Sequence, residues 1–150
     1  MVDVAEFHRH FIDSAPDGLL YVDREGTIVF WNAGCERIFG FSQDEAVGKS
    51  LDIVIPDSQR SRHWEGFAKT IETGRSRYGA GDVLAVPALR KDQTRVSVEF
   101  SIVPFVDEAG TMIGMGAIMR DVTQRFEQTK AMKIELARLR KSVGDLDAPS

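Results

Sequence analysis

The sequence contains a single cysteine, Cys35, among its 150 residues. One cysteine excludes an internal disulfide framework and a zinc site built from several thiolates. No apolar run approaches the roughly 20 residues that a membrane-spanning helix needs. Residues 1–6 lack the basic start and the apolar core of a signal peptide. We therefore expect a cytoplasmic protein with no membrane partner.

An excess of positive charge is also missing. The formal net charge is −4 and the isoelectric point is about 5.4, so nothing draws the whole molecule toward nucleic acid. The chain also lacks a glycine-rich phosphate loop, a Ser-His-Asp arrangement and a pair of carboxylates at positions that would indicate catalysis. Its length is typical of one globular domain. We expect neither a nucleic-acid partner nor enzymatic activity.

Helical periodicity marks the beginning of the chain. In residues 3–15 an apolar stripe recurs at helical spacing and consists of Val4, Phe7, Phe11 and Ile12. Asp3 is the expected N-terminal cap, and Pro16 follows the helix. Residues 1–16 are therefore predicted to form a flanking helix.

A second flanking helix is predicted over residues 124–143. Its apolar positions step by four, three and four residues, which is heptad spacing, and are Met132, Leu136, Leu139 and Val143. We expect Gly144 to end this helix and residues 144–150 to form a disordered tail. Because this stripe has no evident partner within the chain, we expect a homodimer through the terminal helices. The alternative is a monomer in which the stripe folds back on its own sheet.

Residues 17–123 form the predicted core. Strands are expected at 19–22, 27–31, 83–90, 95–106 and 111–121, and helical segments at 33–39, 42–48 and 57–73. The turn ending in Gly26 joins the first two strands, because glycine supplies a positive φ. On the last strand, one face is predicted to carry Ile113, Met115, Ala117 and Met119. This order predicts an α+β fold whose five-stranded antiparallel sheet has the helices of residues 33–73 on one face.

Several short motifs occur in an order that resembles the PAS family across about residues 5–125. They are Asp17-Gly18, Asp23-Arg24-Glu25-Gly26-Thr27-Ile28, Trp31-Asn32-Ala33, Phe39-Gly40-Phe41, Glu45-Ala46-Val47-Gly48-Lys49, Arg90-Lys91-Asp92 and Arg120-Asp121-Val122-Thr123-Gln124-Arg125. The resemblance implies a PAS fold with a cavity between the sheet and the long helix. It also implies a sensor that relays its state through flanking helices to a downstream signalling protein or output domain. A shared fold does not identify the ligand.

The stretch Arg60-Ser61-Arg62-His63-Trp64 on the long helix is similar to FixL-type haem sensors. This resemblance implies that His63 is the iron ligand and that haem b is the leading cofactor candidate. A neutral imidazole binds iron well, and a surrounding apolar pocket holds the porphyrin. The pocket candidates are Ile71, Leu84, Phe100, Ile102, Ile113 and Met115, and Met115 is also considered as a second axial ligand.

Two interpretations of His63 stay open. Many PAS domains carry a similar Arg-His pair without haem, and this chain would then be a cofactor-free dimerisation module or a metabolite sensor. In FixL-type sensors the segment after the helix supplies an arginine that stabilises bound oxygen, whereas here Gly81 is followed by Asp82. An ionised carboxylate cannot donate that hydrogen bond. A haem here would therefore favour redox, CO or NO sensing over tight oxygen sensing.

Flavin photochemistry of the LOV type is disfavoured. It needs a cysteine in a helix just after Gly48, where this chain has Lys49-Ser50-Leu51-Asp52. Cys35 lies earlier and is expected to be a small packed residue. Non-covalent flavin stays open, although no residue indicates it. His8 and His10 are two apart on a helix and are expected at the surface.

Overall fold

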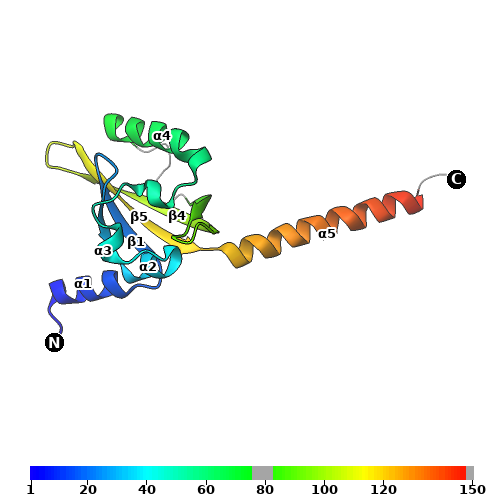
Figure 1. The fold of residues 1–150 in the computed structure, drawn as a ribbon, viewed down its shortest axis with the longest axis horizontal. Coiled ribbons are helices and arrows are strands. Elements are labelled where there is room, and N and C mark those ends of the chain that lie inside the picture. Colours follow the sequence, from blue (N-terminus) through cyan, green and yellow to red (C-terminus); the bar gives the residue numbers. More distant parts are fainter. Residues whose placement is uncertain (76–82, 148–150) are drawn as a thin grey trace.

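Helices and strands follow the sequence pattern with small shifts at their ends. The computed structural model describes residues 1–75 and 83–147, and Figure 1 shows its elements along the chain. They are α1 (Val4–Ser14), β1 (Gly18–Asp23), β2 (Ile28–Trp31), α2 (Ala33–Phe39), α3 (Gln43–Ala46), the 3-10 helices η1 (Leu51–Val54) and η2 (Asp57–Gln59), α4 (Arg60–Thr73), β3 (Leu84–Leu89), β4 (Arg95–Val106), β5 (Met112–Asp121) and α5 (Thr123–Asp147). The helix predicted over 57–73 thus begins as a 3-10 turn.

The five strands form one antiparallel sheet in the order β2-β1-β5-β4-β3. The last strand, β5, therefore lies at the centre of the sheet, between β1 and β4. One hydrophobic core joins the inner face of this sheet to the helices of residues 33–73, with Trp31, Phe39, Val96 and Val98 among its most buried side chains. The predicted α+β fold is confirmed.

Asn32 is a buried polar residue that joins α1, β1 and α2. Its Oδ1 accepts hydrogen bonds from the backbone N–H of Cys35 at 3.0 Å, which caps α2, and of Leu19 at 2.8 Å. Its Nδ2 donates to the carbonyls of Ile12 at 2.8 Å and Asp17 at 3.0 Å. Because its side-chain donors and acceptor are used, these hydrogen bonds offset the cost of removing the amide from water.

The turn between β1 and β2 also positions α4. The carboxylate of Asp23 accepts hydrogen bonds from the backbone N–H groups of Glu25 and Thr27. Gly26 has a φ of 81°, and a Cβ at this position would lie 2.2 Å from the Trp64 ring of α4. Glycine is therefore required here both for the turn and for the packing of the long helix.

A register shift in β5 changes which side chains face the core. Phe105 of β4 pairs with Gly114, but the next residue, Val106, pairs with Met112. Ile113 is therefore the extra residue of a bulge. Met112 is 1% exposed, whereas Ile113 is 43% exposed. The prediction that Ile113 shares a face with Met115 is wrong, because the strict alternation of faces ends at the bulge.

The helix α5 projects away from the core (Figure 1), and no described residue of it is buried. The predicted end at Gly144 is wrong, because this glycine does not adopt the positive φ that ends a helix. The helix instead continues to Asp147, which adds Leu146 to the heptad stripe. The stripe does not fold back on its own sheet. Residues 148–150 of the predicted tail lie outside the described residues.

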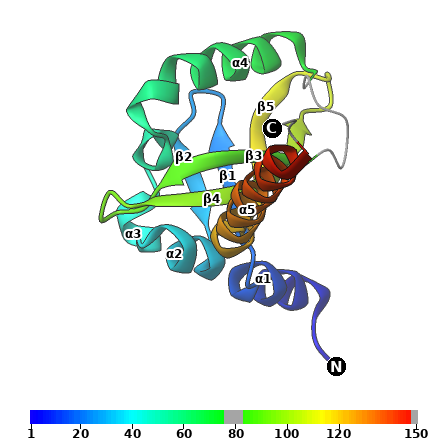
Figure 2. The ribbon, with the colours of Figure 1, turned by 90° about the vertical axis from the view of Figure 1, so that its right-hand side faces the viewer.

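The N-terminal helix α1 also buries none of its side chains. Asp3 occupies the N-cap position, as predicted, although its side chain makes no capping hydrogen bond. Phe7 and Phe11 are exposed and stack on each other with ring centroids 5.7 Å apart. Figure 2 looks along α5 toward the core and shows α1 beside α2. Within residues 1–75 and 83–147, no helix is both long and apolar enough to cross a membrane.

Candidate ligand cavity and helix junction

A cavity of about 670 Å³ lies between α4 and the inner face of the sheet. Small-molecule sites in proteins usually measure about 300–1,000 Å³. The sheet side of the wall is apolar and includes Leu20, Val22, Leu84, Val98, Phe100, Ile102, Met115, Ala117 and Met119. The polar side chains of the described wall come from η2 and α4 and are Ser58, Gln59, Arg62, His63 and Thr70. The cavity therefore suits a largely apolar molecule whose polar groups face the long helix.

The helix α4 is held over the cavity mainly by its first half. The indole Nε1 of Trp64 donates to the carboxylate of Asp52 in η1 at 2.6 Å. The guanidinium of Arg60 donates to the carbonyls of Asp52 and Ile55, both at 3.1 Å. Only Phe67 is buried on the whole helix. The core therefore fills little of the space beneath α4, and this leaves the cavity.

His63 lies in this anchored half and lines the cavity. Its Nδ1 is buried without a hydrogen-bond partner, and no other side-chain nitrogen or oxygen in the described part of the chain is in that state. The ring lies edge-on to Trp64, with centroids 4.6 Å apart, and nearly parallel to Phe67 at 6.1 Å. Burial lowers the pKa of His63 below its ordinary value, although the Asp52 carboxylate opposes this shift. Burial thus favours the neutral form of the imidazole, which is the form that ligates a metal.

Four of the apolar residues predicted from the sequence line the same cavity as His63, namely Leu84, Phe100, Ile102 and Met115. Two do not. Ile113 is displaced to the surface by the bulge, and Ile71 packs against the core beside the cavity. Gly81 and Asp82, on which the argument about oxygen sensing rests, lie outside the described residues.

The face that α4 turns toward the cavity was not predicted from the sequence. That face carries His63, Gly66, Phe67 and Thr70, at the spacing i, i+3, i+4 and i+7. The apolar residues of the same helix, Trp64, Phe67, Ala68 and Ile71, share only Phe67 with this face. Counting helical spacing from His63 would have identified this face.

The residues around the cavity fit a haem b group. An unpaired buried nitrogen costs free energy, and a bound group that satisfied it would recover that cost. His63 would hold the iron, and the apolar side chains of the sheet would hold the ring. Arg62 lines the cavity and forms no ion pair with any residue of the described ranges, so its charge is available to an acidic group of a ligand. A haem ligated by one histidine needs no cluster of metal-binding residues, and residues 1–75 and 83–147 contain none.

Cys35 is not suited to flavin photochemistry. It is fully buried and is not part of the cavity wall. Burial raises the pKa of its thiol to about 12. It is the only cysteine in the sequence, so no thiol is available to a flavin in this cavity. The expectation that Cys35 is a packed core residue is confirmed.

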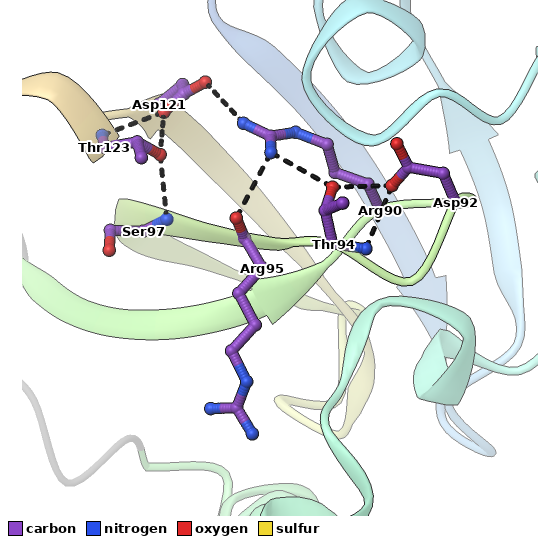
Figure 3. Close-up of polar contacts among 7 residues, drawn as sticks. All are labelled: Arg90, Asp92, Thr94, Arg95, Ser97, Asp121 and Thr123. Atoms are coloured by element: carbon purple, nitrogen blue, oxygen red, sulfur yellow. Dashed lines mark hydrogen bonds and ion pairs between the residues drawn. The ribbon is translucent and has the colours of Figure 1, made fainter.

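A network of polar contacts holds the beginning of α5 (Figure 3). The carboxylate of Asp121 accepts hydrogen bonds from the backbone N–H of Thr123 at 2.9 Å and from its hydroxyl at 2.6 Å. The Thr123 hydroxyl in turn accepts from the N–H of Ser97 on β4 at 3.0 Å. Arg90, the residue after β3, pairs with Asp121 at 3.6 Å and donates to Thr94 at 3.3 Å. The start of α5 is therefore tied to both β4 and the β3–β4 turn.

Arg120, the residue before Asp121 on β5, contacts the segment that follows α1. The guanidinium of Arg120 makes a paired contact with the Asp17 carboxylate, from Nε at 3.1 Å and from Nη2 at 3.0 Å. Two consecutive residues at the end of β5 thus contact the start of α5 and the segment that follows α1. Upstream, Met115, Ala117 and Met119 of the same strand line the cavity. One strand therefore connects the cavity wall to both helices.

A family model for the PAS fold matches residues 6–122. The chain therefore belongs to the PAS family, as the sequence motifs predicted. Among solved structures, the PAS domain of a protein from Colwellia psychrerythraea is similar, with a TM-score of 0.70 at 23% identity, covering 81% of this chain and 99% of that one.

Two sensor proteins are similar in sequence. The chain is 29% identical over 128 residues to the sensor protein FixL of Bradyrhizobium diazoefficiens, and the match covers 85% of this chain and 25% of FixL. It is 25% identical over 133 residues to the oxygen sensor protein DosP of Escherichia coli K12, covering 87% of this chain and 16% of DosP. The chain thus spans a quarter or less of these relatives.

Proposed function

We propose that this chain is a sensory domain that binds a small, largely apolar ligand in the cavity and relays binding through its flanking helices. One observation carries the proposal: an apolar cavity of about 670 Å³ is lined by a histidine whose buried Nδ1 has no partner. The proposed role is binding and relay in the cytoplasm, without catalysis.

Haem b is the leading candidate for the ligand. His63 would ligate the iron, Phe100, Ile102 and Met115 would contact the ring, and Arg62 would face its acidic groups. A bound haem would supply an iron that responds to a diatomic gas or to redox state. The similarity to FixL and DosP supports this choice. Because Asp82 stands where FixL-type sensors supply an arginine, redox, CO or NO is the favoured signal.

The relay is proposed to run along β5. A ligand that displaces Met115 or Met119 would shift the strand whose end holds both flanking helices. At that end, Asp121 contacts the start of α5, and Arg120 contacts the segment that follows α1. A change in the position of β5 would therefore alter the orientation of α1 and α5 relative to the core.

A homodimer is the proposed assembly. The heptad stripe of α5 is exposed along its length and consists of Met132, Leu136, Leu139, Val143 and Leu146. The apolar stripe of α1 is exposed as well. Burying such surfaces between two copies is favourable by roughly 25 cal/mol per Å². A downstream signalling protein or output domain is the further partner, since the similar sensors are at least four times the matched length.

The alternative is a PAS domain that dimerises or binds a metabolite without any cofactor. The exposed stripes of α1 and α5 favour this function, because they would serve an association module whatever the cavity holds.

The absorption spectrum of the purified protein separates these functions. We expect protein from haem-supplemented cells to show a Soret band, with about one haem per chain. A colourless protein from the same cells would contradict haem sensing and support the cofactor-free alternative. A flavin spectrum would identify a different cofactor.

A further inference from the structure

The imidazole of His63 is not oriented by a hydrogen bond at its buried nitrogen. A histidine that ligates a metal is usually oriented by a hydrogen bond from its other ring nitrogen, but Nδ1 of His63 is buried without a partner. Aromatic side chains enclose the ring instead. Trp64 lies nearly perpendicular to it with centroids 4.6 Å apart, and Phe67 lies nearly parallel to it at 6.1 Å. Packing against these two rings therefore sets the orientation of the imidazole.

Trp64 is in turn fixed by two neighbours outside α4. Its indole Nε1 donates to the carboxylate of Asp52 at 2.6 Å, and the same carboxylate pairs with Arg60 at 3.9 Å. The ring of Trp64 also lies over Gly26, where an added Cβ would come within 2.2 Å of it. The indole therefore has little freedom to move while Asp52 holds its nitrogen.

The other tryptophan of the chain differs in what it contacts. Trp31 is buried in the core, donates from Nε1 to the carbonyl of Phe41 at 3.0 Å and packs against Phe39. Its neighbours are thus core groups, and its indole nitrogen uses a backbone acceptor. Trp64 instead joins a carboxylate of η1 to the histidine that lines the cavity.

We propose that Asp52 and Trp64 are positioning residues, which hold the His63 imidazole in the orientation that binds a ligand. Asp52 fixes the indole, and the indole fixes the imidazole. Both act through His63, since neither residue is part of the described cavity wall. This inference rests on the proposed function, and it assigns part of the ligand affinity to η1, on the far side of Trp64 from the imidazole.

Hemin titration followed by absorbance tests the inference. Asp52→Ala removes the acceptor of the indole N–H, so the Kd for hemin should rise about tenfold and the Soret band should shift. Asp52→Asn keeps an oxygen that accepts from the indole and should retain the native Kd and band. Trp64→Phe has no N–H to donate and should behave as Asp52→Ala does. Trp31→Phe is the matched control, because it also deletes an indole hydrogen bond, and it should leave the Kd unchanged.

The ring resonances of His63 in the ligand-free protein give a second readout that needs no hemin. The sequence has three histidines, and His8 and His10 on the exposed helix α1 serve as internal references. At a pH where all three imidazoles are neutral, Asp52→Ala should move the His63 resonances. Asp52→Asn should leave them near their native positions. A loss of stability alone would not produce this difference between two folded proteins.

These variants separate positioning from charge and from stability. If Asp52→Asn weakens hemin binding as much as Asp52→Ala does, the charge is what matters and the inference is wrong. A folded Asp52→Ala protein with the native Kd and native His63 resonances would overturn it as well. Should Asp52→Ala fail to fold, Trp64→Phe decides by the same titration. If the native chain binds no hemin, the haem proposal fails, while the ligand-free resonances still decide whether Asp52 positions His63.

Discussion

Replacing His63 with alanine should abolish hemin binding while leaving the fold intact. His63 is the one histidine that lines the cavity, because His8 and His10 lie on the exposed helix α1. Without its imidazole, the described wall offers no nitrogen that can ligate iron. The fold should persist, because the change removes a buried Nδ1 that has no partner and so relieves a desolvation cost.

The measurement is a hemin titration followed by absorbance, together with circular dichroism of each protein. We expect native hemin binding to be lost in His63→Ala, with at least a hundredfold increase in Kd. His10→Ala is the matched control and should bind as the native chain does. If His63→Ala keeps an unchanged hemin spectrum, His63 is not the iron ligand.

Introducing charge into the heptad stripe of α5 should convert a dimer into a monomer. Leu136 and Leu139 are at the middle of the stripe, and their side chains are 48% and 47% exposed in the isolated chain. Burial of a leucine side chain stabilises by about 2 kcal/mol. The double change to glutamate removes this gain from both helices and adds buried charges, so the dimer Kd should rise at least about a thousandfold, since 1.4 kcal/mol corresponds to a factor of ten.

Light scattering over a dilution series measures this effect. Ile134→Glu is the matched control, because Ile134 is 63% exposed on the same helix but lies off the stripe. It should leave the dimer unchanged. A chain cut after Arg125 should lose most of its affinity for a second copy. A native chain that is monomeric, or a dimer that withstands the cut, would remove α5 from the proposed assembly.

Local turn and cap residues explain why the fold was predictable from the sequence. Gly26 and Asn32 each have a role that depends on neighbours in the chain, a positive φ in one case and a helix cap in the other. The alternation of apolar residues then indicated five strands, and the PAS motifs indicated the fold that they form. The same local reasoning failed at Gly144, because a glycine ends a helix only when its backbone leaves the helical region.

The cavity was predictable only in part, because its wall depends on tertiary geometry. Leu84 and Phe100 were named as pocket candidates and line the cavity, as does His63, which the resemblance indicated. Ile113 was not, since the bulge that exposes it is set by pairing with β4 rather than by its own segment. Ile71 lies on α4 but packs against the core, whereas the cavity is lined by the face of α4 that carries His63 and Thr70. Hydrophobicity marks the side of a helix that is buried, and a ligand site lies where the core is left unfilled.

The dimer Kd of the full chain, measured with and without bound hemin, tests the central claim most directly. If the cavity and the flanking helices are coupled through β5, the two values should differ at least about fivefold, which corresponds to the lower end of typical coupling free energies. His63→Ala should show no such difference under the same conditions. Identical dimer Kd values for the hemin-loaded and hemin-free native chain would contradict the proposal that this domain is a sensor acting through its helices.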